Sequence, residues 1–302
     1  MSNPFKIKIR VDIIIALLFF IFISSIFGEK PYFQNRCLWV VRYSLASKTS
    51  IDELLQFAVQ NNFNHIFVQV RGRGDSLYRS SLVPWSEVLK GDKFDPLQYV
   101  IQEGHKLQLK VHAWVNVYML WSAEKHPSYE HHLFNRHPDW LDVVMKETNK
   151  YLYTSERLTT DASGQDGFYL APNHPSVNPY LLAVFKEILN NYNLDGLHLD
   201  YVRYKNEFHG YNSVGIEQFR SQYNSKNNFD LGFRQTIITK DSYNDYLMKR
   251  EEFLLNSITE LVLKLSSFMK NSHREMILSA AVKPNIEMAK KLYFQEWDMW
   301  LS

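Results

Sequence analysis

Residues 195–204 read Asp195-Gly196-Leu197-His198-Leu199-Asp200-Tyr201-Val202-Arg203-Tyr204. This is the pattern of a buried strand that also carries polar groups. Successive side chains of a strand point to opposite faces, so Leu197, Leu199 and Tyr201 share one face. His198 and Asp200 share the other face, at the end of the strand. Because an unpaired buried carboxylate is costly, we expect Asp200 either to have a partner or to face a pocket.

The composition limits the classes of protein to which this strand can belong. The chain has 302 residues, of which 45% are hydrophobic and 22% charged, so it can form one large domain or two small ones. A net charge of +2 and the lack of a basic tract with interleaved aromatics argue against a nucleic-acid partner. Aromatic residues often form platforms for sugar rings, although most of them are core residues. The single cysteine, Cys37, cannot form an internal disulfide.

The N-terminus has the features of an export signal. Lys6, Lys8 and Arg10 form a positive segment, and an apolar run follows at residues 13–27. This run is somewhat short for a membrane span. A cleavage site near Gly28 would have a bulky residue where a small one is preferred, so residues 1–28 are expected to be a signal peptide or an uncleaved anchor. In both cases we expect the rest of the chain to be exported to the periplasm, the cell envelope or the medium.

Strand-like and helix-like runs alternate after this segment, which predicts βα units and a parallel sheet. Strands are expected at residues 38–43, 65–71, 110–118, 195–204 and 276–283. Helices are expected at residues 50–61, 95–106, 176–191, 243–270 and 285–300. Residues 121–170 are expected to form an elaborated loop, whose His-rich run at 126–137 is interpreted as a solvated loop helix.

Two of the helix starts have recognisable capping patterns. Ser50 with Glu53 predicts a capping box. Asp95 with Pro96 predicts an N-cap followed by a proline in the first helical turn.

The expected strands carry polar residues on one face. That face holds Phe67, Gln69 and Arg71 in the second strand, His112, Trp114, Asn116 and Tyr118 in the third, and Ser279, Ala281 and Lys283 in the fifth. Polar groups near the carboxyl ends of the strands favour a (β/α)8 barrel of the TIM type, whose active site lies at that end. An open doubly wound sheet is the competing fold. No Gly-x-Gly-x-x-Gly follows the first strand, which argues against a dinucleotide-binding fold.

Three motifs occur in a fixed order along the chain. They are His65-Ile66-Phe67-Val68-Gln69-Val70-Arg71-Gly72-Arg73-Gly74-Asp75-Ser76-Leu77-Tyr78, Val111-His112-Ala113-Trp114-Val115-Asn116 and the stretch quoted first. Together they resemble the bacterial glycosyl-hydrolase-like family 10 over about residues 36–302. The resemblance implies an exported (β/α) barrel, and some members of the family are linked to cleavage of peptidoglycan glycan strands. Leu170-Ala171-Pro172-Asn173-His174-Pro175 is similar to the segment before the family's fourth helix, with Asn173 where a glycine is common.

The resemblance also implies three further strands that this sequence does not contain. A barrel opened after its fifth strand leaves a sheet edge and apolar surface uncovered. We expect the domain at residues 36–302 to be an incomplete barrel and the chain to be a fragment of a longer protein. The alternatives are that a partner closes the barrel or that the chain folds poorly alone.

Glycoside hydrolysis generally needs two carboxyl groups that flank the bond. Asp200 is the first candidate, as nucleophile or as base. The resemblance extends to the larger clan of α-glucan-active barrels, where the fourth-strand Asp is the nucleophile. A purely structural role, as a buried partner of Arg203 or Arg71, is the competing interpretation. The available second acids are Glu287, just after the fifth strand, and Asp75, which lies between turn residues after the second strand. The alternative is that the second acid belongs to the strands that this sequence does not contain.

The remaining candidates are expected to bind substrate. They are Arg71, Arg73, Asp75, His112, Trp114, Asn116, Tyr118, His198 and Arg203. The arginines could hold an anionic group such as a lactyl carboxylate, the two histidines could bind sugar hydroxyls or orient Asp200, and Trp114 and Tyr118 could stack on sugars. Each of them could instead be a core or ion-pair residue. We expect no metal site and no cofactor, because no clustered Cys and His pattern is present.

The sequence therefore predicts a glycoside hydrolase that acts on a bacterial cell-wall glycan or a related polysaccharide. The alternative, from a different class, is a carbohydrate-binding or scaffold barrel that keeps the groove but lacks a complete acid pair.

Overall fold

The structure is a computed structural model that describes residues 33–89, 94–145, 158–159, 167–227, 240–272 and 275–301. Contacts divide the chain into Met1–Arg36 and Cys37–Ser302, and the description below concerns the second unit. The predicted export signal at residues 1–28 lies outside the described residues. Within the described ranges, none of the helices combines the length and apolar character needed to cross a membrane.

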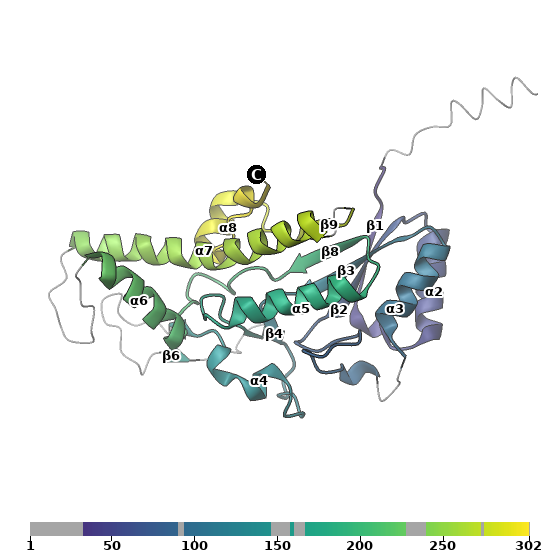
Figure 1. The fold of residues 1–302 in the computed structure, drawn as a ribbon, viewed down its shortest axis with the longest axis horizontal. Helices are drawn as coiled ribbons and strands as arrows, with labels where there is room; N and C mark the ends of the chain where they lie inside the picture. Colours follow the sequence, from purple (N-terminus) through teal and green to yellow (C-terminus); the bar gives the residue numbers. More distant parts are fainter. Residues whose placement is uncertain are drawn as a thin grey trace, which may run out of the picture. The chain divides into compact units, whose positions relative to one another are not determined.

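The main sheet of the described chain has five parallel strands. They are β1 (Cys37–Val40), β2 (His65–Arg71), β3 (Lys110–Asn116), β8 (Gly196–Asp200) and β9 (Ile277–Ala280). Their order in the sheet is β1-β2-β3-β8-β9, the same as their order in the chain (Figure 1). Such an order is that of consecutive barrel staves, whereas a doubly wound sheet reverses direction at a switch point. The predicted barrel-type sheet is confirmed, and in the described residues it is incomplete, with β1 and β9 at its edges.

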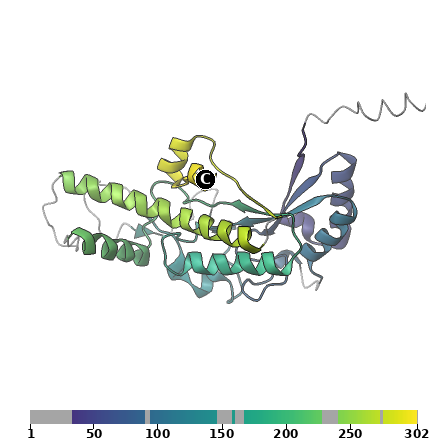
Figure 2. The same ribbon diagram turned by 45° about the horizontal axis from the view of Figure 1, so that its top comes forward.

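Helices alternate with these strands. The principal ones are α2 (Lys48–Gln60), α3 (Pro96–Lys106), α5 (Val177–Asn191), α6 (Ser213–Asn227), α7 (Lys240–Ser272) and α8 (Ile286–Tyr293). In Figures 1 and 2, α5 and α7 run side by side. The apolar stripe of α7 consists of Leu254, Ile258, Leu261 and Leu265, which are buried, as expected for a helix with one face on a core.

The capping patterns explain where two helices begin. Asp95 caps α3 by accepting from Gln98 N, and Pro96 lies in its first turn, as predicted. The predicted capping box of Ser50 with Glu53 is wrong. The N-cap of α2 is Ser47, and Ser50 is the residue that completes the box, because a Ser hydroxyl can replace the usual Glu in reaching back to the N-cap amide.

The core lies between the sheet and its helices. Ile66, Val68, Val111, Val115 and Leu199 are completely buried on this side. Burying each such side chain contributes roughly 1.5 to 3 kcal/mol. The other face of the sheet carries the polar and aromatic residues, and at its edge Trp39 is 53% exposed.

Short elements lie in the connection between β3 and α5. They are β4 (Met119–Trp121), α4 (Leu133–Arg136), η3 (Pro138–Trp140), β5 (Val144–Met145), β6 (Leu158–Thr159) and β7 (Phe168–Tyr169). β4 pairs with β7, and β5 with β6, both antiparallel. The predicted helix at residues 126–137 is reduced to α4. His132 in that run is fully buried rather than solvated, because its Nε2 bonds Arg73 O at 2.7 Å.

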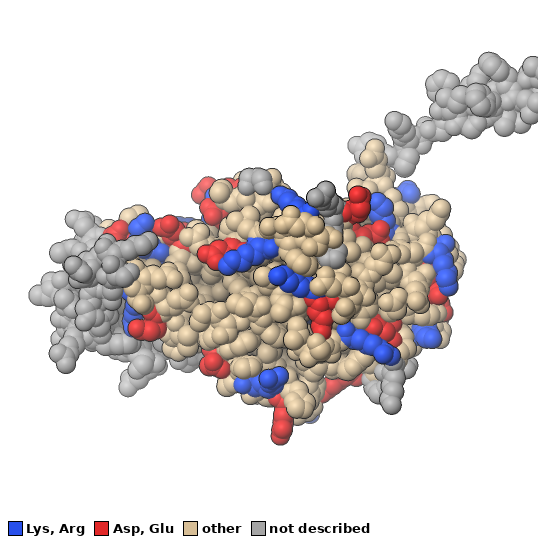
Figure 3. All heavy atoms as spheres, in the orientation of Figure 1, with Lys and Arg blue, Asp and Glu red and all other residues tan. Residues whose placement is uncertain are grey.

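The predicted helix at residues 285–300 is interrupted. Asn285 caps α8 through Met288 N, and Phe294 ends it in the left-handed region at φ 51°. A short 3-10 helix, η5 (Trp297–Leu301), follows. On the face seen in Figure 3, acidic and basic side chains are interspersed without a large area of one sign, which agrees with the nearly balanced net charge.

Candidate active site

The inner face of the sheet brings five of the predicted site residues into register. His112 lies beside Phe67 of β2, Trp114 beside His198, and Asn116 beside Asp200. The parallel strands end at the same edge, so Asn116 and Asp200 both lie at the carboxyl end of the sheet. In barrels this end carries the active site.

Asp200 is held in a defined orientation at this end. The indole Nε1 of Trp114 donates to Asp200 Oδ2 at 3.2 Å and to Asn116 Oδ1 at 3.1 Å. The amide of Tyr201 donates to Asp200 Oδ1 at 2.8 Å. Asn116 Nδ2 in turn donates to Gly72 O at 2.8 Å. Asp200 is half-buried. Its carboxylate is therefore fixed by donors on both oxygens, while part of the residue remains exposed to solvent.

The backbone after Asp200 takes an unusual conformation. Tyr201 has φ 51°, a region that a bulky residue rarely adopts and that often marks functional sites. This turn directs Arg203 toward aromatic rings: its guanidinium carbon lies 5.2 Å from the ring centre of Tyr201, 5.8 Å from that of Tyr169 and 5.0 Å from that of Tyr293. Arg203 Nη1 also donates to two backbone carbonyls of the same turn.

Arg71 does not lie on the inner face, contrary to the sequence prediction. A bulge shifts the pairing from Gln69 with Trp114 to Arg71 with Val115, so Arg71 follows the aliphatic face. It is fully buried and donates from Nη1 to Asn116 O and, at 3.3 Å, to Val117 O. It is therefore not the partner of Asp200, and it is not available to a substrate at the sheet's inner face.

The loop after β2 holds Arg73 and Asp75 in structural contacts. Asp75 accepts from Arg73 N at 3.0 Å and from the Ser86 hydroxyl at 2.5 Å, and it is 5% exposed. These bonds close the turn around Gly74, whose φ is 71°. Arg73 Nε donates to Ser122 Oγ at 3.0 Å, so Arg73 ties this loop to the one after β3.

Two other predicted residues lie apart from Asp200's hydrogen-bonding partners. Tyr118 is fully buried and donates to Asn178 Oδ1 of α5 at 2.8 Å. Its ring is therefore not a stacking surface. Glu287 is exposed in the first turn of α8, where the positive end of the helix dipole favours an acidic side chain.

Histidines line the inner face below Asp200. His112 Nε2 bonds His65 Nδ1 at 2.8 Å, and His198 Nδ1 bonds the Ser279 hydroxyl at 2.9 Å. Phe67 stacks on His112 with ring centres 4.5 Å apart. Burial lowers the pKa of His112 and of His198 to about 4, so both are neutral near pH 7. In the described part of the chain, no three His, Cys, Asp or Glu side chains converge in a way that could hold a metal ion.

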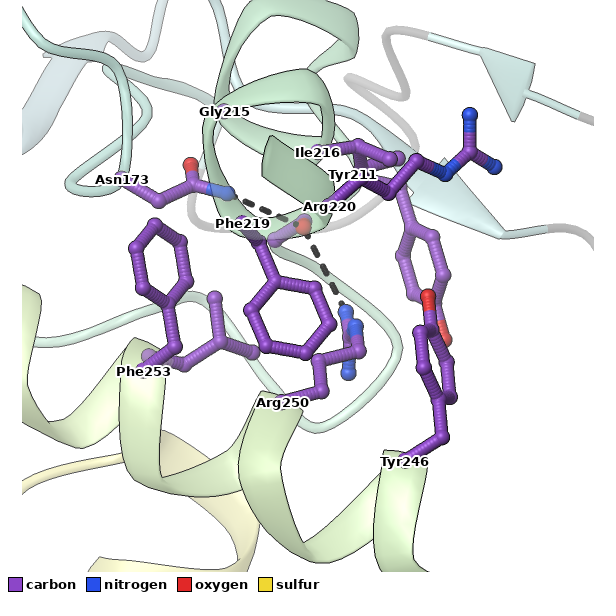
Figure 4. Close-up of a pocket in the computed structure, with 11 residues that line it drawn as sticks. Asn173, Tyr211, Gly215, Ile216, Phe219, Arg220, Tyr246, Arg250 and Phe253 are labelled. Carbon is purple, nitrogen blue, oxygen red and sulfur yellow. Dashed lines mark hydrogen bonds between the residues drawn. The ribbon is translucent and has the colours of Figure 1, made fainter. Parts of the chain in front are cut away.

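Asn173 connects the loops that surround this end of the sheet. Asn173 Nδ2 and Arg250 Nη2 both donate to Gly210 O, at 3.2 and 3.3 Å (Figure 4). Gly215 leaves room for the amide, because a Cβ there would lie 2.5 Å from Asn173 Cγ. The hollow between these residues measures about 20 Å³, which suits a water molecule rather than a sugar. Asn173 thus fastens the loop before α5 to the loop after β8.

Sequence reasoning did not single out Tyr169, Tyr293 and Asp142. The tyrosines meet Arg203 only because β7 and α8 fold back onto the turn after β8. Asp142 is buried and accepts from Gly210 N at 3.0 Å. Its partner lies in a distant loop, and no local sequence signal indicates it. Strand alternation places Lys283 on the same face as Ser279. That pattern was the sequence signal that could have indicated a cation at the carboxyl end of β9.

Comparisons with known proteins identify the family. Residues 35–302 match Glycosyl hydrolase-like 10. Glycosyl hydrolase DigH of Escherichia coli K12 is 30% identical over 142 residues, which cover 45% of this chain and 30% of that protein. Glycosyl hydrolase YngK of Bacillus subtilis 168 is 27% identical over 172 residues, which cover 54% of this chain and 30% of that protein. The matched parts thus span less than a third of the length of these relatives.

Solved structures share the fold. The glycoside hydrolase domain of PgaB (BpsB) from Bordetella bronchiseptica gives a TM-score of 0.55 at 13% identity, covering 88% of this chain and 71% of that one. Alpha-L-fucosidase isoenzyme 2 from Paenibacillus thiaminolyticus gives 0.54 at 14% identity, covering 82% and 32%. At such identities the likeness concerns the fold alone. Because the family match spans nearly the whole described chain, the protein belongs to the Glycosyl hydrolase-like 10 family.

Proposed function

We propose that this chain carries the catalytic Asp200 of a glycoside hydrolase that cleaves O-glycosidic bonds in a bacterial cell-wall glycan, with peptidoglycan glycan strands as the first candidate. The observation that carries the proposal is the carboxylate of Asp200 at the carboxyl end of β8, held by Trp114 Nε1 and Tyr201 N. Membership of the family and the glycoside hydrolase folds of the structural neighbours support a hydrolase.

In this proposal Asp200 acts as the nucleophile or as the base that activates water. Either role requires an ionised carboxylate with a fixed direction and access to the substrate. A second carboxyl group protonates the leaving oxygen. Glu287 remains a prediction for that role, and its exposed position in the first turn of α8 makes the Glu287→Gln variant the direct test.

The decisive experiment is an assay on purified glycan strands, with new reducing ends as the readout. Asp200→Asn is expected to lower kcat by roughly a hundredfold to ten-thousandfold, because the amide can neither attack nor accept a proton. Asp52→Asn, on the exposed side of α2, is the matched control and should retain activity. Unchanged turnover in Asp200→Asn would remove Asp200 from catalysis.

A non-catalytic carbohydrate-binding barrel is the second candidate. It is favoured by the exposed position of the candidate second acid, Glu287, in the first turn of α8. Binding of glycan strands without any release of product would support this second function, and measurable hydrolysis abolished by Asp200→Asn would refute it.

The proposed site of action is outside the cytoplasmic membrane. The basis is the charged segment at Lys6, Lys8 and Arg10 followed by the apolar run at residues 13–27. Fractionation of the producing cells is expected to find the protein in the envelope or the medium. Retention in the cytoplasm would contradict this part of the proposal.

A further inference from the structure

Two cationic side chains converge on one aromatic ring at the carboxyl end of the sheet. Lys283 Nζ lies 4.7 Å from the ring centre of Tyr293, and the guanidinium carbon of Arg203 lies 5.0 Å from the same centre. Both distances are within the range of cation–π contacts. Like charges that share a ring repel each other, so this arrangement is favoured when an anion binds nearby.

A chain of contacts links Lys283 and Arg203 to Asp200. Ala281 N donates to Leu199 O at 2.8 Å, which continues the pairing of β8 with β9 beyond the strand. Ser279 bonds His198 on the inner face. Every second residue after it shares that face by strand alternation, which gives Ala281 and then Lys283. On the β8 side, Arg203 packs over the ring of Tyr201, the residue whose amide binds Asp200.

The backbone around Lys283 is fixed by side chains of the segment after α8. Lys283 N donates to Gln295 Oε1 at 2.8 Å, and Trp297 Nε1 donates to Lys283 O at 3.0 Å. Gln295 is fully buried. The backbone that carries the Lys283 side chain is therefore held in place by these hydrogen bonds.

The charge of Lys283 is not balanced by a carboxylate within the described residues. The nearby acids Glu296 and Asp298 both pair with Lys290, at 3.2 and 3.0 Å. Lys283 is half-buried and has no carboxylate among the described residues within ion-pair distance. A partly buried ammonium in this position fits an anionic group supplied by a ligand.

We propose that Lys283, with Arg203 on the same Tyr293 ring, forms a subsite that binds a carboxylate substituent on a sugar next to the bond positioned at Asp200. This inference rests on the proposed function and assigns to it a substrate class, a glycan that bears carboxylates. Arg71 and Arg73 cannot serve this purpose at the inner face, because one is buried toward the helices and the other ties two loops together.

The test compares two substrates made from one preparation of glycan strands. In the first the carboxylates are intact, and in the second they are chemically reduced to alcohols. The wild-type protein is expected to have the higher kcat/KM on the intact strands. Lys283→Met keeps the length and apolar stem of the side chain but removes its charge, and it is expected to lower the ratio of the two kcat/KM values by roughly tenfold or more.

Two variants check that the effect comes from the charge of this lysine. Lys283→Arg keeps a cation and should retain most of the preference, and Lys291→Met removes an exposed lysine of α8 and should leave the ratio as in the wild type. A wild-type ratio near one, or a Lys283→Met ratio equal to that of the wild type, would overturn the inference.

Failure of the proposed function is distinguishable from failure of the inference. If the wild-type protein hydrolyses neither substrate, the enzyme proposal fails. The affinity for each of the two preparations, measured by calorimetry, then tests whether the subsite exists. Tighter binding of the intact strands that is lost in Lys283→Met supports the subsite. Equal binding of both preparations rejects it.

Discussion

Trp114 determines the direction in which the carboxylate of Asp200 points. Its indole N–H is shared between Asp200 Oδ2 and Asn116 Oδ1. Trp114→Phe keeps the ring and removes the donor, so we expect kcat to fall roughly tenfold while KM changes less, as for the loss of one hydrogen bond to a charged group. The measurement is steady-state hydrolysis of glycan strands.

A positioning role for Trp114 has a further signature. In an Asp200→Asn background, Trp114→Phe should cause little additional loss, because the two residues act as one unit. Trp85→Phe, which changes an exposed tryptophan, is the control. Equal losses from Trp114→Phe in both backgrounds would show that the indole acts independently of Asp200.

At the scale of single residues, strand alternation predicted most of the inner face. It placed His112, Trp114, Asn116, His198 and Asp200 together because side chains of a regular strand alternate strictly. The same rule gave the wrong side for one neighbour of this group, Arg71. One extra residue before it reverses the alternation, and the carbonyls that Arg71 then reaches, those of Asn116 and Val117, are distant in the sequence.

At the scale of elements, the close packing of β8 between β3 and β9 depends on Gly196. A Cβ at this position would collide with His112 Nδ1 and lie 2.5 Å from Ile277 O. Neither neighbour can move freely, since one is a ring bonded to His65 and the other is backbone of β9. We expect Gly196→Ala to lower the free energy of unfolding by about 1 to 3 kcal/mol, measured by urea denaturation.

Gly72→Ala provides the comparison for this prediction. A Cβ at Gly72 would meet first the end of the Arg42 side chain, at 2.9 Å, which can rotate away. Its cost should therefore be smaller than that of Gly196→Ala. If both substitutions lowered the free energy of unfolding equally, the close approach of His112 to β8 would not be the reason for a glycine at position 196.

The start of α3 could be predicted because its signal is local, whereas the connections could not. Asp95 with Pro96 defines the start of α3 because the cap and the proline act within one turn. β4 and β7 pair across the long insertion, and this pairing has no local pattern of its own. The left-handed Phe294 that ends α8 likewise follows from the contacts of Gln295 with Val202 and Ala281 rather than from its own identity.

At the scale of the whole molecule, buried histidines make stability depend on pH. Burial lowers the pKa of His112 and His198 from 6.5 to about 4, while the neighbouring Asp195 partly opposes this for His112. The unfolded chain thus binds more protons than the folded one between about pH 4 and 6.5, and these groups make stability rise with pH across that window. Urea unfolding should show a smaller rise in His198→Gln, whereas an unchanged slope would contradict the assignment.

Asp142 contributes a dependence of the opposite sign. Burial raises its pKa from 3.8 to about 7, although the amides of Val143 and Gly210 donate to it and Arg250 lies near. The folded chain therefore binds more protons than the unfolded one between about pH 4 and 7, and this group lowers stability as pH rises through that window.

Replacing this carboxyl group isolates its effect on the molecule. Asp142→Asn cannot ionise and can still accept from Gly210 N, so it should gain stability relative to the wild type as pH rises from 4 to 8, by a few kcal/mol at most. Unfolding by urea at pH 4, 6 and 8 measures the difference. Asp139→Asn, at an exposed position nearby, should show no comparable trend. If the stability of Asp142→Asn relative to the wild type instead fell between pH 4 and pH 8, the ionised carboxylate would be a stabilising link between the loops after β3 and β8, and the predicted sign would be wrong.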